Sequence, residues 1–583
     1  MKQWKRYKSY ILPYKSAFIL GPLMMVTEVL GEILLPKFMS MIINHGVAQK
    51  DGGYILKMGL VMAITSFLMA AGGILGAYFA AKASISFTSD LRRDLFARVQ
   101  QFSFKNIDTF STGSLVTRLT NDIQQVQNLI MMGLRMMLRA PGMFLGALVM
   151  AFWMNAELAA VILVVIPLLT AAIAWILRTA YPRFTAMQKA LDTLNSGIQE
   201  VLTNVRVVKS FVREDYEEKR FAATNRELKE AGLRALKIVI ATMPVMMFAM
   251  NVTTLAVVWF GGNLIIGGRM AVGDLTAFTT YIVQILMSLM MLSMVFLQSS
   301  RAMASIRRID EVLDEPIDLS DENASQKDRK VEKGRVEFKD VSFSYREGGE
   351  PVLSHISLTA EPGETIGILG ATGSGKTSLV QLIPRLYDVT EGSVRVDGID
   401  VREYSLKNLR DGVGMVLQKN VLFSGTIEEN LRWGDETATE EEVRRAAVYA
   451  QADSFVNSFA EGYKTEMGQG GVNVSGGQKQ RLCIARALLK KPKILILDDS
   501  TSAVDTATEA AIRTAFREDL KDTTKFIIAQ RLSSLEYADR ILVLEDGRII
   551  GEGTQEKLLA SCEAYREIYE TQYGKRADGE VMA

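Results

Sequence analysis

The stretch TIGILGATGSGKTSLVQLIPRLY, residues 365–387, decides the fold expected of the second half of this chain. A short apolar run leads through a glycine-rich loop of the form G-x-x-x-x-G-K-[ST], residues 370–377, into a helical pattern. Glycines let backbone N–H groups converge on phosphate oxygens, and the N-terminus of the helix adds a favourable dipole. The stretch therefore predicts a strand, a phosphate-binding loop and a helix within an α/β domain.

The loop and a second strand predict a nucleotide site with a magnesium ion. Lys376 is expected to reach the β- and γ-phosphates, and the Thr377 hydroxyl to bind Mg²⁺. The pattern KILILD, residues 493–498, reads as a buried strand that ends in the carboxylate of Asp498, the second half of the magnesium site. The residues of the loop expected to hold the nucleotide are Gly370, Ala371, Thr372, Gly373, Ser374, Gly375, Lys376, Thr377 and Ser378.

A second helix end in this domain also suits an anion. Ser475, Gly476, Gly477 and Gln478 stand just before a helical pattern, QRLCIARALL. Small residues at a helix N-terminus expose backbone N–H groups to a phosphate. The alternative is an ordinary serine cap followed by glycines. Two phosphate-binding helix ends in one chain are unexpected for a monomer.

The first half of the chain reads as a membrane domain. Long uncharged segments occupy residues 58–81, 158–177, 238–268 and 275–300, and two shorter or interrupted ones occupy 16–43 and 140–156. Uncharged stretches of about 18 or more residues can cross the hydrocarbon core as helices. We therefore expect six membrane-spanning helices.

The connections between these segments predict the orientation. Arg and Lys gather in the two long, helical-looking loops between spans two and three and between spans four and five, whose tips are expected near residues 102–113 and 211–221. Basic loops mark the cytoplasmic side, so both termini are expected in the cytoplasm. The basic start MKQWKRYKSY could also open a cleaved signal peptide, but five more spans follow it.

Composition gives the domain boundaries. The membrane domain is expected at 1–310, a charged linker at 311–334, the soluble α/β domain at 335–575 and a tail at 576–583. The formal net charge of +1 gives no indication of a nucleic-acid partner. The two cysteines, Cys483 and Cys562, fit neither a disulfide framework nor a zinc spacing.

Four motifs in this order resemble the nucleotide-binding domain of an ABC transporter: GATGSGKT at 370–377, VSGGQ at 474–478, ILILDD at 494–499 and SAVD at 502–505. With the six expected spans, residues 10–570 resemble a half-transporter of the multidrug exporter type. The resemblance implies ATP and Mg²⁺ as ligands, with Tyr345 stacking on adenine, Gln418 touching Mg²⁺ and Asp505 lying in a loop that crosses to a partner subunit.

The resemblance also implies a head-to-tail dimer that holds two ATP molecules between its nucleotide-binding domains. Each ATP meets the phosphate-binding loop of one subunit and the SGGQ segment of the other. This arrangement gives a reason for the two helix ends, and Ser475 is expected to donate to the γ-phosphate held by the partner.

Two residues depart from the family pattern. Asp499 stands where the family has the Glu that positions the attacking water. The Asp side chain is shorter than that of Glu by one carbon–carbon bond, so its oxygens reach about 1.5 Å less far. Gln530 stands where the family has a His that contacts the γ-phosphate, and an amide cannot become cationic. Both changes predict a degenerate site that retains ATP with weak hydrolysis. The alternative is neutral change in a homodimer that tolerates slow turnover.

The resulting hypothesis is a subunit of a bacterial heterodimeric multidrug exporter in the plasma membrane. Its partner is expected to be a second half-transporter with the competent Glu and His. The cargo is expected to be an apolar or amphipathic small molecule that enters among the membrane lipids. The alternatives are a homodimeric lipid or lipopeptide flippase and an ATP-gated regulatory assembly.

Two features of the membrane half predict where the cargo binds. Methionines line one face of each of two spans, at i, i+3, i+4 and i+7, and such adaptable side chains suit varied apolar shapes, although lipid contact or helix packing is the alternative. Glu28 and Glu32 lie one turn apart in the first span and could attract cationic drugs, or could pair with Lys37 or Arg139. The methionines are Met243, Met246, Met247, Met250, Met287, Met290, Met291 and Met294.

Overall fold

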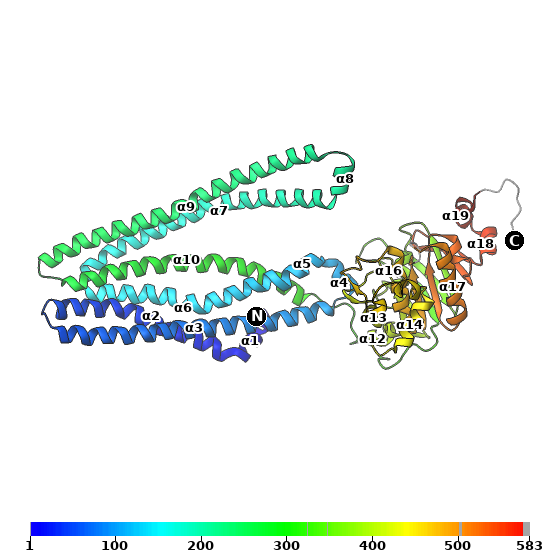
Figure 1. The fold of residues 1–583 in the computed structure, drawn as a ribbon, viewed down its shortest axis with the longest axis horizontal. Coiled ribbons are helices and arrows are strands. Elements are labelled where there is room, and N and C mark those ends of the chain that lie inside the picture. The colour runs from blue at the N-terminus through cyan, green and yellow to red at the C-terminus, as the bar shows by residue number, and fades with distance from the viewer. Residues whose placement is uncertain (1, 323, 347, 501–503, 575–583) are drawn as a thin grey trace. The chain divides into compact units, whose positions relative to one another are not determined.

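The computed structural model describes the chain except residues 1, 323, 347, 501–503 and 575–583. Within helices, the side chains of 2–4, 169, 173, 177, 239, 242, 243, 246, 293, 294, 296–298, 300 and 301 also lie outside the description. The chain divides into two compact units (Figure 1). Unit 1 comprises Met1–Val99 and Gly113–Asp314, and unit 2 comprises Gln100–Thr112 and Glu315–Ala583.

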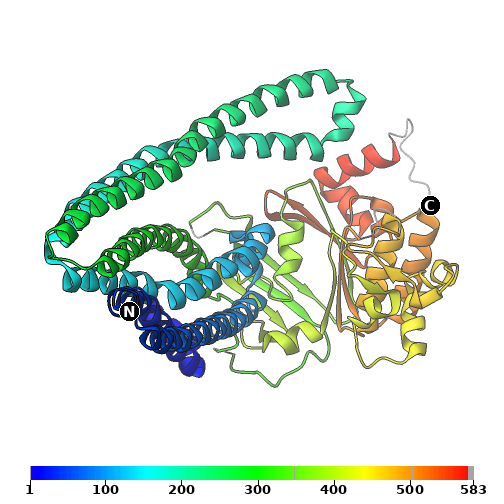
Figure 2. The same ribbon diagram turned by 60° about the vertical axis from the view of Figure 1, so that its left-hand side comes forward.

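The described residues of unit 1 form helices joined by short turns, and Figure 2 shows the long helices from a second direction. Its elements are α1 (Lys2–Ile11), η1 (Leu12–Tyr14), α2 (Lys15–Met41), η2 (Ile42–Val47), α3 (Gly52–Gln100), α5 (Thr112–Thr117), η3 (Arg118–Asp122), α6 (Ile123–Met154), α7 (Ala156–Thr203), α8 (Val205–Ser210), α9 (Glu214–Ile266) and α10 (Val272–Asp314). Six helical stretches in the described residues are long and apolar enough to cross a membrane, which confirms the expected number.

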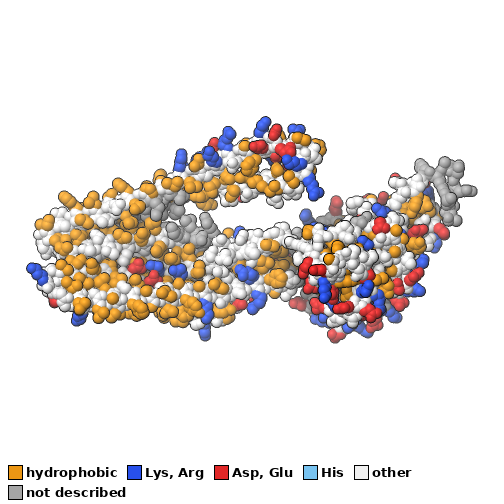
Figure 3. Space-filling model, in the orientation of Figure 1, with side chains coloured by type: hydrophobic (Ala, Val, Ile, Leu, Met, Phe, Trp, Pro, Cys, Tyr) orange, Lys and Arg blue, Asp and Glu red, His pale blue; other side chains and the backbone are white. Residues whose placement is uncertain are grey.

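Spans α2, α6 and α9 pack against α10. Phe278 and Tyr281 of α10 are completely buried, and the Tyr281 hydroxyl donates to the carbonyl of Ile33 at 2.8 Å. Outward-facing apolar side chains such as Trp175 and Phe248 remain about 70% exposed, at 69% and 71%. Figure 3 shows hydrophobic side chains along these helices, with charged ones gathered at the α8 end of the α7–α9 hairpin. An apolar exterior of this kind is stable in lipid rather than in water.

Short helices form the tips of the two long loops. At the first tip, α4 (Phe104–Thr109) begins after Ser103, whose hydroxyl accepts from the Asn106 N–H in a reciprocal cap. At the second tip, the short helix is α8, and α9 already begins at Glu214. The second tip therefore lies earlier than the expected 211–221, because the charged run from Glu214 continues as helix instead of forming the turn.

Unit 2 contains a six-stranded sheet in the order β12-β11-β3-β10-β9-β6 and a four-stranded sheet in the order β2-β1-β4-β5. A two-stranded ribbon pairs β7 with β8. The strands are β1 (Val336–Phe343), β2 (Leu353–Ala360), β3 (Thr365–Gly370), β4 (Glu391–Val396), β5 (Ile399–Asp400), β6 (Val413–Val416), β7 (Gly425–Thr426), β8 (Glu466–Met467), β9 (Ile494–Asp498), β10 (Thr524–Ile528), β11 (Arg540–Glu545) and β12 (Arg548–Gly553).

Helices cover the six-stranded sheet, and the buried strands are rich in Ile, Leu and Val, as expected of a parallel sheet. The helices are α11 (Lys376–Gln381), α12 (Leu406–Asp411), α13 (Ile427–Arg432), α14 (Glu440–Tyr449), α15 (Asp453–Val456), η4 (Gly462–Lys464), α16 (Gly476–Leu489), α17 (Thr506–Asp519), η5 (Leu532–Leu535), α18 (Gln555–Ser561) and α19 (Glu563–Tyr573). The expected fold class, a helical membrane domain followed by an α/β domain, is confirmed. The expected tail at 576–583 lies outside the described residues.

The parallel register aligns the ends of three central strands. β10 lies between β3 and β9, parallel to both, and Ile528 pairs with Ile368 and with Asp498. The segments that follow these strands begin near Gly370, Asp499 and Ala529. They therefore emerge at the same edge of the sheet, where ligands bind in open α/β folds.

Candidate nucleotide site

A cavity of about 590 Å³ lies at this edge of the sheet. It brings together most of the site residues expected from the sequence. Those that line it are Tyr345, Gly370, Ala371, Thr372, Gly373, Gly375, Lys376, Thr377, Ser378, Gln418, Asp499 and Gln530. Ser374 and Asp498 lie just behind the wall, at 5% and 2% exposed.

The glycine-rich loop takes the conformation that its glycines allow. Gly373 and Gly375 have φ values of +88° and +93°, which L side chains rarely adopt. A Cβ at Gly370 would stand 2.2 Å from the carbonyl oxygen of Leu544. The loop therefore packs closely against the backbone of β11 at Leu544. It leads directly into α11, which begins at Lys376.

Lys376 lies over the loop. Its Nζ donates to the carbonyls of Gly370 at 2.9 Å and Ala371 at 2.6 Å. Burial lowers the pKa of this ammonium, and the nearby Asp498 and Asp499 oppose that shift. A phosphate within the loop would supply the strong counter-charge that a half-buried ammonium favours.

Thr377 and Asp498 form a pair suited to Mg²⁺. The Thr377 hydroxyl donates to Oδ1 of Asp498 at 3.0 Å. Burial raises the pKa of the Asp498 carboxyl, and the neighbouring Asp499 adds to this shift. A divalent cation offsets the cost of burying this carboxylate. No group of three or more His, Cys, Asp or Glu that could hold a metal ion occurs in the described part of the chain. Thr377 and Asp498 offer one hydroxyl and one carboxylate, and the third expected ligand, Gln418, lines the same cavity. Mg²⁺ completes such a set with phosphate oxygens and water.

The two residues that depart from the family pattern contact each other. Nε2 of Gln530 donates to Oδ2 of Asp499 at 2.9 Å. Asp499 has a φ of +46°, and its N–H donates to the carbonyl of Ile528 at 3.0 Å. This backbone bond fixes the turn after β9, where the Asp499 carboxylate meets Gln530, two residues after the end of β10.

Tyr345 lies at the side of the cavity within an aromatic cluster. Its ring centroid is 4.8 Å from that of Phe343 and 5.1 Å from that of Tyr387. Its hydroxyl lies 2.8 Å from Oγ of Ser378. The ring is 39% exposed, so a face remains available for stacking on a base.

The SGGQ segment and Asp505 do not line this cavity. Ser475 caps α16, accepting the Gln478 N–H at 3.3 Å, while Gln478 Oε1 accepts the Ser475 N–H at 2.9 Å. Asp505 caps α17 by accepting the Thr508 N–H at 3.0 Å. Both capping groups are exposed. Thr501, Ser502 and Ala503, between Asp499 and Asp505, lie outside the described residues.

The C-terminal helix α19 adds two residues that the sequence analysis did not identify. Ile568 lines the cavity. Gln572 donates from Nε2 to the carbonyl of Gln530 at 2.8 Å and accepts the Leu532 N–H at 2.9 Å. One amide thus holds the backbone on both sides of Arg531. No pattern in the sequence joins this helix to the nucleotide site, because an exposed Gln reads as an ordinary helix surface.

In the membrane unit, Arg139 lies between the two glutamates of α2. Its guanidinium is 3.2 Å from a carboxylate oxygen of Glu28 and 3.2 Å from one of Glu32. Lys37 lies 3.7 Å from Asp274 instead. Of the two pairings considered for the glutamates, the structure therefore has the one with Arg139, and this triad keeps one uncompensated negative charge.

The methionine faces are partly exposed. Met247 and Met287 are 59% and 48% exposed, whereas Met250 and Met290 pack against the core around α10. The side chains of Met243, Met246 and Met294 lie outside the description. The described methionines therefore divide between helix packing and open surface.

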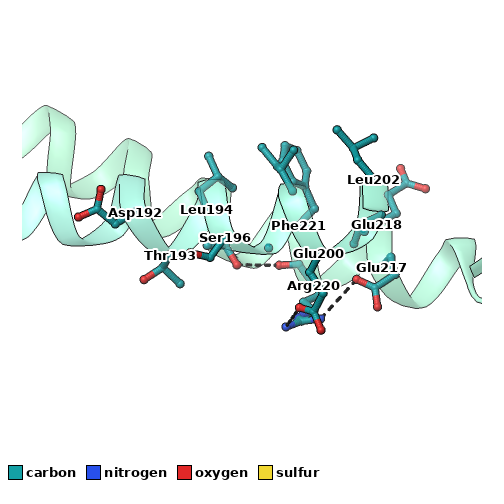
Figure 4. A pocket seen from close by; sticks show the side chains of 14 residues that line it. Asp192, Thr193, Leu194, Ser196, Glu200, Leu202, Glu217, Glu218, Arg220 and Phe221 are labelled. Atoms are coloured by element: carbon teal, nitrogen blue, oxygen red, sulfur yellow. Dashed lines mark hydrogen bonds and ion pairs between the residues drawn. The ribbon is translucent and has the colours of Figure 1, made fainter. Parts of the chain in front are cut away.

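A larger cavity, about 710 Å³, lies between α7 and α9 near α8 (Figure 4). Carboxylates dominate its polar lining, and Arg220 pairs with Glu200 at 3.2 Å and Glu217 at 3.6 Å. It holds none of the phosphate-binding features of the nucleotide cavity. Of these two cavities, the one beside β3 is therefore the candidate nucleotide site.

Comparisons with known proteins identify the family of this chain. Residues 18–289 match the model of the ABC transporter transmembrane region, and residues 353–502 match that of the ABC transporter. The chain is 42% identical to the uncharacterized ABC transporter ATP-binding protein YfiB of Bacillus subtilis over 97% of this chain and 98% of that protein. It is 32% identical to the putative multidrug export ATP-binding/permease protein YgaD of the same organism, over 97% and 99%.

A solved structure of a bacterial Atm1-family ABC exporter with ATP bound is similar along almost the whole chain. It is 26% identical, with a TM-score of 0.78 over 98% of this chain and 99% of that one. The likeness includes the membrane helices as well as the α/β domain. The chain therefore belongs to the ABC transporter family, as an exporter that carries its transmembrane region and its nucleotide-binding domain in one polypeptide.

Proposed function

We propose that this exporter subunit works in a heterodimer, in which its own ATP site is degenerate and its SGGQ segment completes the competent site of its partner. ABC exporters work as ATP-dependent dimers in the membrane, and the proposal concerns which subunit turns ATP over. The observation that carries it is the hydrogen bond between Gln530 and Asp499.

The chemistry of this pair supports retention of ATP over hydrolysis. The Asp499 carboxylate is shorter than a Glu by about one carbon–carbon bond, 1.5 Å. Misplacement of a catalytic group by about that distance can cost on the order of a hundredfold in rate. The Gln530 amide donates to this carboxylate and cannot carry a proton, whereas an imidazole can. Neither group in the pair is suited to activate water.

The binding residues are intact in this proposal. Lys376 and the loop amides hold the phosphates, Thr377 and Asp498 hold Mg²⁺ with Gln418 beside it, and Tyr345 stacks on adenine. Mg²⁺ supplies charge neutralisation between the phosphates when it is bound. The site therefore keeps ATP affinity while it lacks a well-placed base.

The exposed SGGQ segment supports a role toward a second subunit. The N-terminus of α16 lies outside the chain's own cavity, and its backbone N–H groups suit an anion. Ser475 would donate to the γ-phosphate held by the partner, and Asp505 would lie near the same boundary. The partner is a second half-transporter with Glu and His at the positions of Asp499 and Gln530.

We further propose that the cargo is an apolar or amphipathic drug-like molecule, moved out of the cytoplasm by alternating access. The putative multidrug export function named for the relative YgaD and the exposed methionines of α9 and α10 support this class of cargo. The proposed location is a bacterial plasma membrane, with both termini and unit 2 in the cytoplasm. A lipid or lipopeptide flippase shares the same architecture and is the second candidate.

The test is to tag the chain in its native membrane, purify it gently and identify co-purifying subunits by mass. A second half-transporter in equal amount, with Glu and His at the two positions, supports the proposal. Copies of this chain alone would contradict it, and so would ordinary exporter rates of ATP hydrolysis in the isolated chain that Asp499→Ala abolishes.

A further inference from the structure

A second polar cavity in unit 2 lies at the opposite edge of the six-stranded sheet from the nucleotide site. It has a volume of about 220 Å³. Thr365 at the start of β3 and Lys525 near the start of β10 line it, whereas the nucleotide cavity adjoins the ends of those strands. We refer to it as the basic pocket.

The basic pocket carries an excess of positive charge. Its lining includes Arg513 and Arg517, one turn apart on α17, and Lys521 and Lys525. Asp539 is the one carboxylate in that lining. Oδ2 of Asp539 accepts the Thr365 N–H at 2.8 Å, so a backbone hydrogen bond already stabilises part of its negative charge.

Lys525 is buried, and one guanidinium nitrogen of the half-buried Arg513 is buried as well. Lys525 is only 4% exposed, and its Nζ donates to the carbonyl of Thr523 at 2.9 Å. Burial lowers the pKa of its ammonium, opposed by Asp539. Nε of Arg513 is buried and meets no acceptor among the described residues. Buried cationic donors are costly unless an anion or further acceptors compensate them.

An aromatic ring holds the two arginines in place. The guanidinium carbons of Arg513 and Arg517 lie 5.7 Å and 5.6 Å from the ring centroid of Tyr537. Arg517 is 64% exposed, and its ion-pair partner Glu518 is 3.9 Å away and equally exposed at 63%. Such an exposed pair is weak, so Arg517 remains available to an incoming anion.

We propose that the basic pocket binds a small phosphate-bearing anion from the cytoplasm. Arg and Lys donors favour phosphate, and the Arg fork matches its oxygens. The volume of 220 Å³ is below the range of about 300–1,000 Å³ usual for sites of drug-sized ligands, so a phosphate group fits better than a whole nucleotide.

The position of the basic pocket gives this binding a consequence for the nucleotide site. α17 begins one residue after Asp505, and η5 begins two residues after Gln530. Arg513 joins these elements by donating to the carbonyl of Ser533. An anion bound between them would therefore stabilise the segments that follow Asp505 and Gln530. This inference does not depend on the heterodimer proposed above.

The test uses the full chain in lipid nanodiscs, in whatever assembly it is purified, with a saturating non-hydrolysable ATP analogue to fill the nucleotide site. Inorganic phosphate is the probe, and the melting temperature is compared with that in potassium chloride of equal ionic strength. We expect phosphate to raise the melting temperature in a saturable manner. Arg517→Gln with Lys521→Gln should weaken the apparent phosphate affinity by about tenfold or more, since two charged donors are lost.

Matched variants keep the test decisive. Lys525→Met should remove the effect, and the double variant at two exposed positions gives an answer even where Lys525→Met does not fold. Arg548→Gln, exposed on β12 and outside the basic pocket, should respond like the parent chain. No stabilisation of the parent chain beyond that in chloride would overturn the proposal. An equal shift in all variants would also overturn it, because the anion would then bind elsewhere.

Discussion

The Nε2 atom of Gln530 lies 2.9 Å from Oδ2 of Asp499, and the carbonyl of the same Gln530 accepts a hydrogen bond from Gln572 of α19. Gln530, two residues after the end of β10, is therefore held through both its side chain and its backbone. Its side-chain partner is Asp499, the other residue of the proposed degenerate ATP site. Its backbone partner is Gln572 of the C-terminal helix α19.

Restoring the family residues should restore hydrolysis. We expect the double variant Asp499→Glu, Gln530→His to raise the ATPase rate of the purified chain by at least about tenfold, because a misplaced base can cost on the order of a hundredfold. Steady-state phosphate release measures this. Lys376→Ala in the same background serves as the control and should remove the gain. An unchanged rate would argue against degeneracy at these two positions.

Loosening the backbone contact of α19 should act on the nucleotide site at a distance. Gln572→Leu removes two hydrogen bonds, each worth about 1 kcal/mol, so we expect the KM for ATP to rise by about threefold to tenfold, with a smaller change in kcat. Gln572→Glu keeps the acceptor for Leu532 and should be intermediate. Glu570→Gln, exposed on the same helix, should leave both constants unaltered; a similar rise there would mean that α19 acts only as a scaffold.

The first loop tip joins the aromatic cluster inside unit 2. The Tyr387 hydroxyl donates to Asp108 of α4 at 2.9 Å, and burial together with this carboxylate raises the tyrosine's pKa. Tyr387→Phe should lower the stability of unit 2 by about 1 kcal/mol and leave ATP affinity within about twofold. Thermal unfolding and nucleotide titration measure the two effects. Asp108→Asn should lower the stability of unit 2 by less, since its amide oxygen still accepts the hydrogen bond. A larger loss of stability in this variant would mean that Asp108 stabilises unit 2 mainly through other contacts.

The buried Asp498 predicts a pH dependence of stability. Because burial raises its pKa in the folded chain above the ordinary 3.8, its ionisation destabilises the fold at neutral pH. That penalty disappears as the pH falls through the raised pKa and toward 3.8. Asp498→Asn should therefore melt higher than the parent chain at pH 7.5 without nucleotide, and the difference should shrink at pH 4.5. A difference that is constant with pH would contradict this cause.

The charged triad of the membrane unit predicts opposite effects on cargo selectivity. Glu28→Gln leaves a neutral pair between Arg139 and Glu32 and should weaken transport of cationic compounds more than of neutral ones. Arg139→Met leaves two negative charges and should shift selectivity toward cations. Transport into inverted vesicles, with matched cationic and neutral dyes, measures both. Equal losses for the two dye classes would mean that the triad only supports the packing of α2 and α6.

Much of this protein could be predicted from local pattern. Four spans follow from long uncharged runs and two from shorter or interrupted ones, because the thickness of the bilayer sets their length. The strand–loop–helix around Lys376 follows from glycine spacing, because few other residues allow the backbone angles observed at Gly373 and Gly375. The loop residues from Gly370 to Ser378 were predicted because they stand between a strand and a helix, whereas Tyr345, Gln418 and Gln530 followed from the family resemblance and Ile568 was not predicted.

Only the tertiary structure decided which distant side chains meet. The sequence by itself did not show whether Glu28 and Glu32 pair with Lys37 or with Arg139. Helix packing places Arg139 between the two glutamates. Gln572 reaches Gln530 because α19 returns to the edge of the sheet. The basic pocket likewise depends on α17 packing beside β10. Local pattern therefore determines the helices, the strands and the phosphate-binding loop, whose contacts come from the backbone. Contacts between distant elements depend on packing, which no spacing along the chain specifies.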